Sequence, residues 1–333
     1  MIEAASRSMT RPDDLISEFK ADCLTRGITP ETTRRYLSSL KIFDKYLKDN
    51  NCNILDVDRD VLRNFINYLR VDREVSQRTI ETYFAAMASF YGYLEYERHI
   101  DKNPVPEVRK RYLRKYKDNN DGQTRRLISI DEMRRLINST MDVRDRAIIT
   151  LLAKTGIRRN ELIKLDIDDI DLVEQNIRLK PTPKRTNRTV FFDDEAAMVL
   201  HRWIRSSQET RNKFGTNALF ISNMGGRLNR NGVYLAVTRP AEKLGLHNPN
   251  SDRMEDHFSP HCCRHWFTTH LRRAGMPREF IQELRGDVRK EAIDIYDHID
   301  KKELRESYLA HIPQLGITVP FLSINSTKDF FSN

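Results

Sequence analysis

Apolar residues recur at helical spacing through the whole first third of the chain, and this pattern limits the fold more than any other feature. It begins at Leu15 and continues to about Ile100, with apolar side chains three or four positions apart. Thr29 and Pro30 supply a cap and a first-turn proline for one helix, and Ser76 opens another. The pattern predicts four helices, whose aromatic side chains are expected to form the core of a small helical domain.

The chain has 333 residues, enough for about two domains. We place the helical domain at residues 1–106, a basic linker at 107–126, a second domain at 127–316 and a tail at 317–333. Ser129 and Glu132 form a capping box at the start of the second domain. Residues 176–180 and 188–192 are expected to be short strands around a turn, with helices before and after them. The expected fold class is mainly α with a small β-sheet (α+β).

The charge of the chain favours a polyanionic partner. Charged residues make up 32% of the sequence and the formal net charge is +9, so nucleic acid is the first candidate. A basic run follows the helical domain without an acidic residue inside it. Such a run is often only a solvated segment, but between two domains of a basic protein we favour contact with a DNA backbone. Its cations are Arg109, Lys110, Arg111, Arg114, Lys115 and Lys117.

The sequence favours a cytoplasmic protein without a metal or other cofactor. No run approaches the roughly 18 apolar residues of a membrane span, and the first residues lack the apolar core of a secretion signal. The four cysteines show neither a disulfide framework nor the spacing of a zinc knuckle. Histidines surround Cys262 and Cys263, but adjacent helical residues point about 100° apart and do not chelate one ion easily.

The residues that most directly indicate a chemical function lie near the carboxyl end of the chain. Ser259 and Pro260 are typical of a helix start, and in that helix His261 and Arg264 project from one face, where both can hold one phosphate. Tyr296 follows as an isolated tyrosine. The pattern indicates a site that attacks a phosphodiester, with this tyrosine as the candidate nucleophile.

These segments, taken together, resemble the conserved boxes of the tyrosine recombinases, the phage-integrase and Xer-like family. The boxes are residues 155–162 (Thr-Gly-Ile-Arg-Arg-Asn-Glu-Leu), 259–265 and 284–287, followed by Tyr296. Arg264, position 287 and Tyr296 are separated by 23 and 9 residues, as in the family. Residues 76–104 resemble the end of the family's helical core-binding domain, so the likeness covers nearly the whole chain. It implies a SAM-like DNA-clamp domain followed by a tyrosine-recombinase catalytic domain.

The resemblance also implies a role for each residue of the site. Arg158 and Arg264 would clamp the non-bridging oxygens of the scissile phosphate, because a guanidinium fork makes paired hydrogen bonds to phosphate. His261 would add a hydrogen bond or assist proton movement. A lysine of the β-hairpin is the family's general acid. Lys184 is our choice for it, and Lys180 remains the alternative.

Position 287 departs from the family, which most often has a second histidine there. Asp287 is an acceptor that does not donate when ionised. It would orient Tyr296 or Arg264 by a hydrogen bond, or mark a slower or inactive variant. Glu161 is expected to support Arg158 rather than to react.

The implied function is site-specific recombination through a 3′-phosphotyrosine and a Holliday junction, without ATP or a metal, in mobile-element integration or excision. The partner is double-stranded DNA at a specific site, bound by four copies of the chain. A type IB topoisomerase and a non-catalytic DNA-binding module are the alternatives. The apolar stripe of residues 304, 308 and 312 packs either on a neighbouring subunit, as in the family, or on its own domain.

Overall fold

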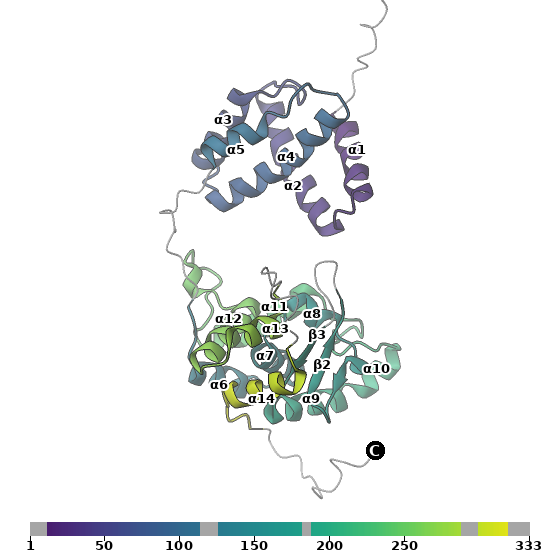
Figure 1. The fold of residues 1–333 in the computed structure, drawn as a ribbon, viewed down its shortest axis with the longest axis vertical. Helices are drawn as coiled ribbons and strands as arrows, with labels where there is room; N and C mark the ends of the chain where they lie inside the picture. Colours follow the sequence, from purple (N-terminus) through teal and green to yellow (C-terminus); the bar gives the residue numbers. More distant parts are fainter. Residues whose placement is uncertain (1–11, 114–125, 182–187, 288–298, 319–333) are drawn as a thin grey trace, which may run out of the picture. The chain divides into compact units, whose positions relative to one another are not determined.

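The computed structural model of the chain describes residues 12–113, 126–181, 188–287 and 299–318, which belong to two compact units (Figure 1). The N-terminal unit spans Met1–Asn120 and the C-terminal unit spans Asp121–Asn333. Each has its own hydrophobic core. None of the helices in the described ranges has the length and apolar composition that crossing a bilayer requires.

The N-terminal unit is a helical bundle, as its apolar spacing predicts. Its first elements are α1 (Pro12–Thr25), α2 (Pro30–Asp49), α3 (Arg59–Val71) and α4 (Gln77–Tyr96), and they confirm the expected helices. Thr29 and Ser76 accept hydrogen bonds from the first-turn N–H groups of α2 and α4. The aromatic side chains form the core, with the rings of Phe43 and Phe65 4.8 Å apart.

A further helix, α5 (Val105–Tyr112), corrects the expected start of the linker at residue 107. Val105 and Val108 are buried against the N-terminal core, and α5 packs on α3 and α4. Asn103 begins the helix by accepting a hydrogen bond from the N–H of Val105. The helical unit therefore continues through Leu113, which is also buried.

The C-terminal unit is built around the buried helix α7. Every residue of α7 from Arg146 to Thr155 is buried, and α6, α9, α11 and α12 pack against it. Of the remaining helices, α8 packs on α11, α10 on α9, and α13 on α12 and on the strand β3 (Arg188–Phe191) (Figure 1). Its helices are α6 (Ile130–Ser139), α7 (Val143–Thr155), α8 (Arg159–Lys164), α9 (Asp194–Ser206), α10 (Gln208–Phe214), α11 (Arg230–Lys243), α12 (Pro260–Arg273), α13 (Arg278–Arg285) and α14 (Lys301–His311), with short 3-10 turns at Ile167–Asp169 and Met254–Asp256.

A small antiparallel sheet lies on this helical core. Its strand order is β1 (Ile170–Asp171), β2 (Asn176–Leu179), β3 (Arg188–Phe191), with Ile177 opposite Val190. Strands β2 and β3 confirm the two strands that the sequence predicts. Both Ile177 and Val190 are buried, so the inner face of the hairpin is fixed on the core.

The apolar stripe of α14 packs on its own unit. Leu304, Tyr308 and Ile312 are buried in the C-terminal core, and the Tyr308 hydroxyl donates a hydrogen bond to the carbonyl of Lys154. Residues 313–318 then run along the same unit, where Glu195 accepts hydrogen bonds from the N–H groups of Leu315 and Ile317. The attached segment therefore includes Ile317, the residue at which we expected the tail to begin.

Candidate active site

The first side of the site is set by Gly156, which ends α7. Its φ is +61°, and a Cβ at this position would lie 2.3 Å from the ring of Phe267. Both the left-handed backbone and the close approach of the ring require glycine. The chain turns here, so that Arg158 becomes the N-cap of α8.

Two arginine side chains from different elements meet at one carbonyl oxygen. Arg158 donates from Nη1 to the carbonyl of Arg285 at 2.9 Å, and Arg264 of α12 donates from Nη2 to the same oxygen at 2.9 Å. Arg264 also donates from Nη1 to the carbonyl of Gly156 at 2.6 Å. Arg264 is only 4% exposed, and these contacts fix its guanidinium group.

Asp287 lies against both guanidinium groups. Its Oδ1 is 3.3 Å from Nη2 of Arg158 and 3.5 Å from Nη2 of Arg264. Its Oδ2 forms an ion pair with Nε of Arg285 at 3.0 Å. Gly286, with φ +60°, ends α13 in the left-handed region, and the Asp287 N–H closes the turn by donating to the carbonyl of Gln282. The structure thus brings together three of the predicted site residues, Arg158, Arg264 and Asp287.

The buried ion pair of Glu161 with Arg188 holds Arg158 in position. Glu161 accepts hydrogen bonds from the Arg158 N–H at 2.7 Å and from both terminal nitrogens of Arg188 at 2.9 Å each. Arg188 also donates from Nε to the carbonyl of Leu284. The side chains of Glu161 and Arg188 are 8% and 6% exposed. Glu161 therefore supports Arg158 as expected, and Arg188 ties β3 to α8 and α13.

Arg188 is a part of the site that the sequence did not predict. Its one local signal is an arginine at the start of a strand whose other residues are Thr, Val and Phe. Nothing nearby in the sequence indicates that its partner is Glu161, 27 positions earlier.

The electrostatics of the site favour an anion. Burial and the neighbouring guanidinium groups of Arg158 and Arg285 lower the pKa of Arg264 to about 9. Burial acts to raise the pKa of Glu161, but the hydrogen bonds and charge of Arg188, with the Arg158 N–H, outweigh it and lower that pKa below its ordinary value. Arg264 is still a cation at neutral pH, and an anion next to it would be stabilised.

His261 lies in the first turn of α12, three positions before Arg264, and its side chain is exposed. Ser259 is the N-cap and Pro260 the first residue of this helix, as predicted. The Ser259 N–H donates to Sγ of Cys262, so this thiol takes part in the cap.

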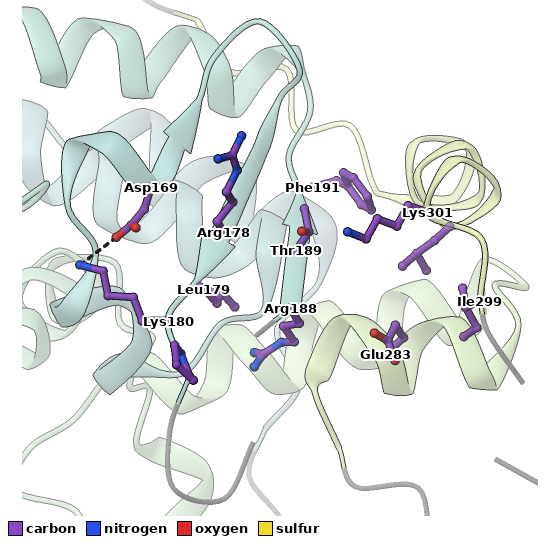
Figure 2. Close-up of a pocket in the computed structure, with 12 residues that line it drawn as sticks. Asp169, Arg178, Leu179, Lys180, Arg188, Thr189, Phe191, Glu283, Ile299 and Lys301 are labelled. Atoms are coloured by element: carbon purple, nitrogen blue, oxygen red, sulfur yellow. Dashed lines mark ion pairs between the residues drawn. The ribbon is translucent and has the colours of Figure 1, made fainter. Parts of the chain in front are cut away.

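The two candidate lysines differ in what the structure describes. Lys180 pairs with Asp166 and, at 3.3 Å, with Asp169; Figure 2 shows its side chain directed toward Asp169. The hydrogen bond to Asp166 raises the pKa of Lys180, which makes it a weaker acid. Lys184 and Tyr296 lie outside the described residues, in the ranges 182–187 and 288–298.

A cavity of about 390 Å³ lies between strands β2 and β3, α13 and α14 (Figure 2). Arg188 forms part of its wall and joins it to Glu161. Its lining carries both signs of charge, from Arg178 and Lys301 on one hand and Asp169 and Glu283 on the other.

The basic run of the sequence is only partly described. Arg109, Lys110 and Arg111 lie on α5, where Arg109 is half-buried and the other two are exposed. Arg114, Lys115 and Lys117 lie outside the described residues. In the described part of the chain, no cluster of three histidine, cysteine or acidic side chains suited to a metal ion occurs.

Comparison with known families covers both units. The model of the phage integrase family matches residues 123–303, and that of the phage integrase SAM-like domain matches residues 14–122. The tyrosine recombinase XerC of Herpetosiphon aurantiacus is 32% identical over 284 residues, which cover 82% of this chain and 86% of that protein. The tyrosine recombinase XerD of Staphylococcus epidermidis is 25% identical over 300 residues, covering 87% of this chain and 95% of that protein.

Solved structures share the fold. A lambda integrase fragment (residues 75–356), crystallised as a dimer bound to a COC′ core site, superimposes with a TM-score of 0.63 at 16% identity, covering 87% of this chain and 99% of the fragment. The XerH recombinase bound to its difH substrate gives a TM-score of 0.59 at 20% identity, covering 88% of this chain and 83% of that one. The expected fold class is confirmed.

Proposed function

The chain belongs to the phage integrase family of tyrosine recombinases, and from this premise we propose that it cuts and rejoins double-stranded DNA at a specific site. The observation that carries the proposal is that the side chains of Arg158 and Arg264 both donate a hydrogen bond to one point, the carbonyl oxygen of Arg285. Two guanidinium forks at that point suit the non-bridging oxygens of a phosphodiester, and they offset the charge that grows on its pentavalent transition state.

The proposed reaction is a transesterification at phosphorus. The Tyr296 oxygen attacks, the bond from phosphorus to the 5′ oxygen breaks, and the products are a 3′-phosphotyrosine and a 5′ hydroxyl. A free phenol has a pKa near 10, so at pH 7 only about one in a thousand is ionised, a deficit of roughly 4 kcal/mol. The charges of the arginines, with His261 beside them, reduce this deficit when the phosphate is bound.

The departing 5′ oxygen needs a proton, and we propose Lys184 as its donor. Lys180 is less suited, because its ion pairs with Asp166 and Asp169 hold its amino group and raise its pKa. The phosphotyrosine keeps the bond energy, so rejoining to a second strand needs no ATP. Exchange of both strands through a four-way junction requires four copies of the chain on two duplexes. We infer integration or excision of a mobile element as the use.

Covalent trapping tests this function. A nicked suicide duplex that carries the target site should form a protein adduct with the parent chain and none with Tyr296→Phe. Arg158→Lys should lose far more cleavage than binding, because one of several phosphate contacts hardly changes affinity whereas the transition state needs the fork. A parent chain that binds the duplex and forms no adduct is a DNA-binding module. Relaxation of a supercoiled plasmid without exchange between two sites identifies a topoisomerase.

A further inference from the structure

Asp287 contacts a terminal guanidinium nitrogen of each of the two arginines that form the site. One oxygen of its carboxylate lies between Nη2 of Arg158 and Nη2 of Arg264, at 3.3 and 3.5 Å, and the other pairs with Nε of Arg285 at 3.0 Å. A carboxylate that bridges two arginines has the charge and the oxygen spacing of part of a phosphate group.

We propose that the Asp287 carboxylate is an internal substitute for the scissile phosphate. It occupies the space between the guanidinium groups of Arg158 and Arg264, here called the Arg158–Arg264 clamp, until the DNA backbone displaces it. The inference rests on the proposed function, because it takes the clamp as the phosphate site. It gives this position a role opposite to that of a hydrogen-bond donor: the carboxylate competes with the substrate and leaves the clamp when the substrate enters.

The contacts of Asp287 suit an occupant that leaves. Charge-assisted N–H···O bonds are commonly about 2.7–2.9 Å long, whereas those from Asp287 to Arg158 and Arg264 are 3.3 and 3.5 Å. The side chain is 30% exposed, so its carboxylate has access to solvent when it leaves the arginines. The backbone stays in place, because Gly286 and the Asp287 N–H close the end of α13.

The contacts of the arginines suit an exchange of anions. The hydrogen bonds of Arg158 and Arg264 to the carbonyl of Arg285, and of Arg264 to that of Gly156, do not involve the Asp287 side chain. The clamp therefore keeps its shape while its anion changes. Burial and the charges of Arg158 and Arg285 lower the pKa of Arg264, and the charge of the Asp287 carboxylate acts in the opposite direction. A phosphate in its place would do the same.

Binding of inorganic phosphate tests the inference without DNA. Phosphate that binds the folded chain raises its unfolding temperature by mass action. Both tryptophans of the chain, Trp203 and Trp266, lie in the C-terminal unit, so their fluorescence reports unfolding of the unit that holds the clamp. Phosphate is compared with chloride at equal ionic strength, in the parent, in Asp287→Asn, in Asp287→His and in the control Asp252→Asn, which removes an exposed carboxylate from the loop between α11 and α12.

Asp287→Asn should bind phosphate about tenfold more tightly than the parent, since a neutral amide of the same shape does not compete as an anion. Asp287→His should also bind it more tightly, and Asp252→Asn should match the parent. In a single-turnover assay with suicide DNA, Asp287→Asn should form adduct faster than the parent. Unchanged or weaker phosphate binding in both Asp287 variants would overturn the inference, and so would slower adduct formation in Asp287→Asn, because the carboxylate would then assist the reaction.

The two failures are distinguishable. If the parent and all variants form no adduct although phosphate binding tightens as expected, the recombinase function fails and the competition by Asp287 stands. If the parent forms adduct and the Asp287 variants bind phosphate no better, the function stands and the substitute role fails.

Discussion

Replacing Glu161 with glutamine should destabilise the C-terminal unit by an amount that can be worked out from its contacts. The carboxylate is 8% exposed and accepts both terminal N–H groups of Arg188, which is 6% exposed. Glutamine keeps the shape and one carbonyl oxygen, but its NH₂ group faces one of the Arg188 donors and the buried guanidinium loses its counter-charge. Removing one partner of a buried ion pair costs about 3–5 kcal/mol, and we expect the lower end because one acceptor remains.

Urea unfolding followed by tryptophan fluorescence measures this loss in the correct unit, because Trp203 and Trp266 both lie there. With a slope of roughly 2–3 kcal/mol per molar urea, the midpoint should fall by about 1 M or more. The control is Glu306→Gln, an exposed carboxylate on α14, which should stay within about 0.5 kcal/mol of the parent. A loss below about 1 kcal/mol for Glu161→Gln would refute the reasoning, because it is the value of an exposed pair.

A double-variant cycle separates the ion pair from simple packing. Arg188→Met removes the buried cation, and in the background of Glu161→Gln it should restore part of the lost stability, since a neutral pair of similar volume is tolerated. DNA cleavage should not recover with it, because the Arg158 N–H and side chain depend on the charged Glu161 for their position. Recovery of cleavage together with stability would show that Glu161 acts through folding alone.

Three further predictions concern the same unit. Gly156→Ala should lower the free energy of unfolding by roughly 3 kcal/mol, because it combines a left-handed φ with a clash against Phe267. Gly275→Ala, with φ +97° and open space around it, should lower it by roughly 1 kcal/mol. Urea midpoints of the two variants give the comparison, and equal losses of stability would contradict it. Lys154→Met should lower the free energy of unfolding by about 3–5 kcal/mol, because this fully buried lysine pairs with Asp193 and Glu195 and donates to the carbonyl of Pro313. Limited proteolysis after residue 312 should become faster. An unchanged cleavage rate would contradict the attachment of residues 313–318. Acid should destabilise the unit, because the pKa values of Glu161, Asp166 and Glu195 are lowered in the fold. The stability that these carboxylates contribute is present above the ordinary carboxyl pKa of 4.5 (Glu) or 3.8 (Asp) and is lost as the pH falls through the lower folded values. Urea midpoints should therefore fall between pH 6 and pH 3, and a flat profile would count against the ion pairs.

The features that sequence predicts well here are those with local signals. Helices α2 and α4 begin at Thr29 and Ser76 because a hydroxyl cap and helical apolar spacing occur together. Strand β3 follows from its run of β-branched and aromatic residues at 189–191, whereas in β2 the signal is the alternation of apolar Ile177 and Leu179 with polar residues. Helix α5 was missed because only Val105 and Val108 mark its buried face among many charges, and their burial depends on the rest of the bundle.

The support of the site is not local and could not be predicted in the same way. Arg188, Glu161 and Leu284 are distant in sequence, and only the fold brings the strand, the helix start and the helix end together. The contacts of Asp287 with Arg158 and Arg264 likewise span 129 and 23 positions. Its family position indicated that it belongs to the site and could bond Arg264, but not that the same carboxylate oxygen also contacts Arg158.

The arginine clamp is held by the ends of helices, and this explains how it can be rigid although its buried carboxylate, Glu161, is shared with Arg188. Arg264 donates to the carbonyl of Gly156 at the end of α7, and Arg158 and Arg264 both donate to the carbonyl of Arg285 at the end of α13. The last carbonyls of a helix have no partner within it and carry about half a negative charge between them. They satisfy the hydrogen-bond donors of the guanidinium groups but neutralise only part of their charge. The remaining charge is available to whichever anion reaches the clamp, and the Asp287 carboxylate, close but at long contact distances, is the one that a phosphate must replace.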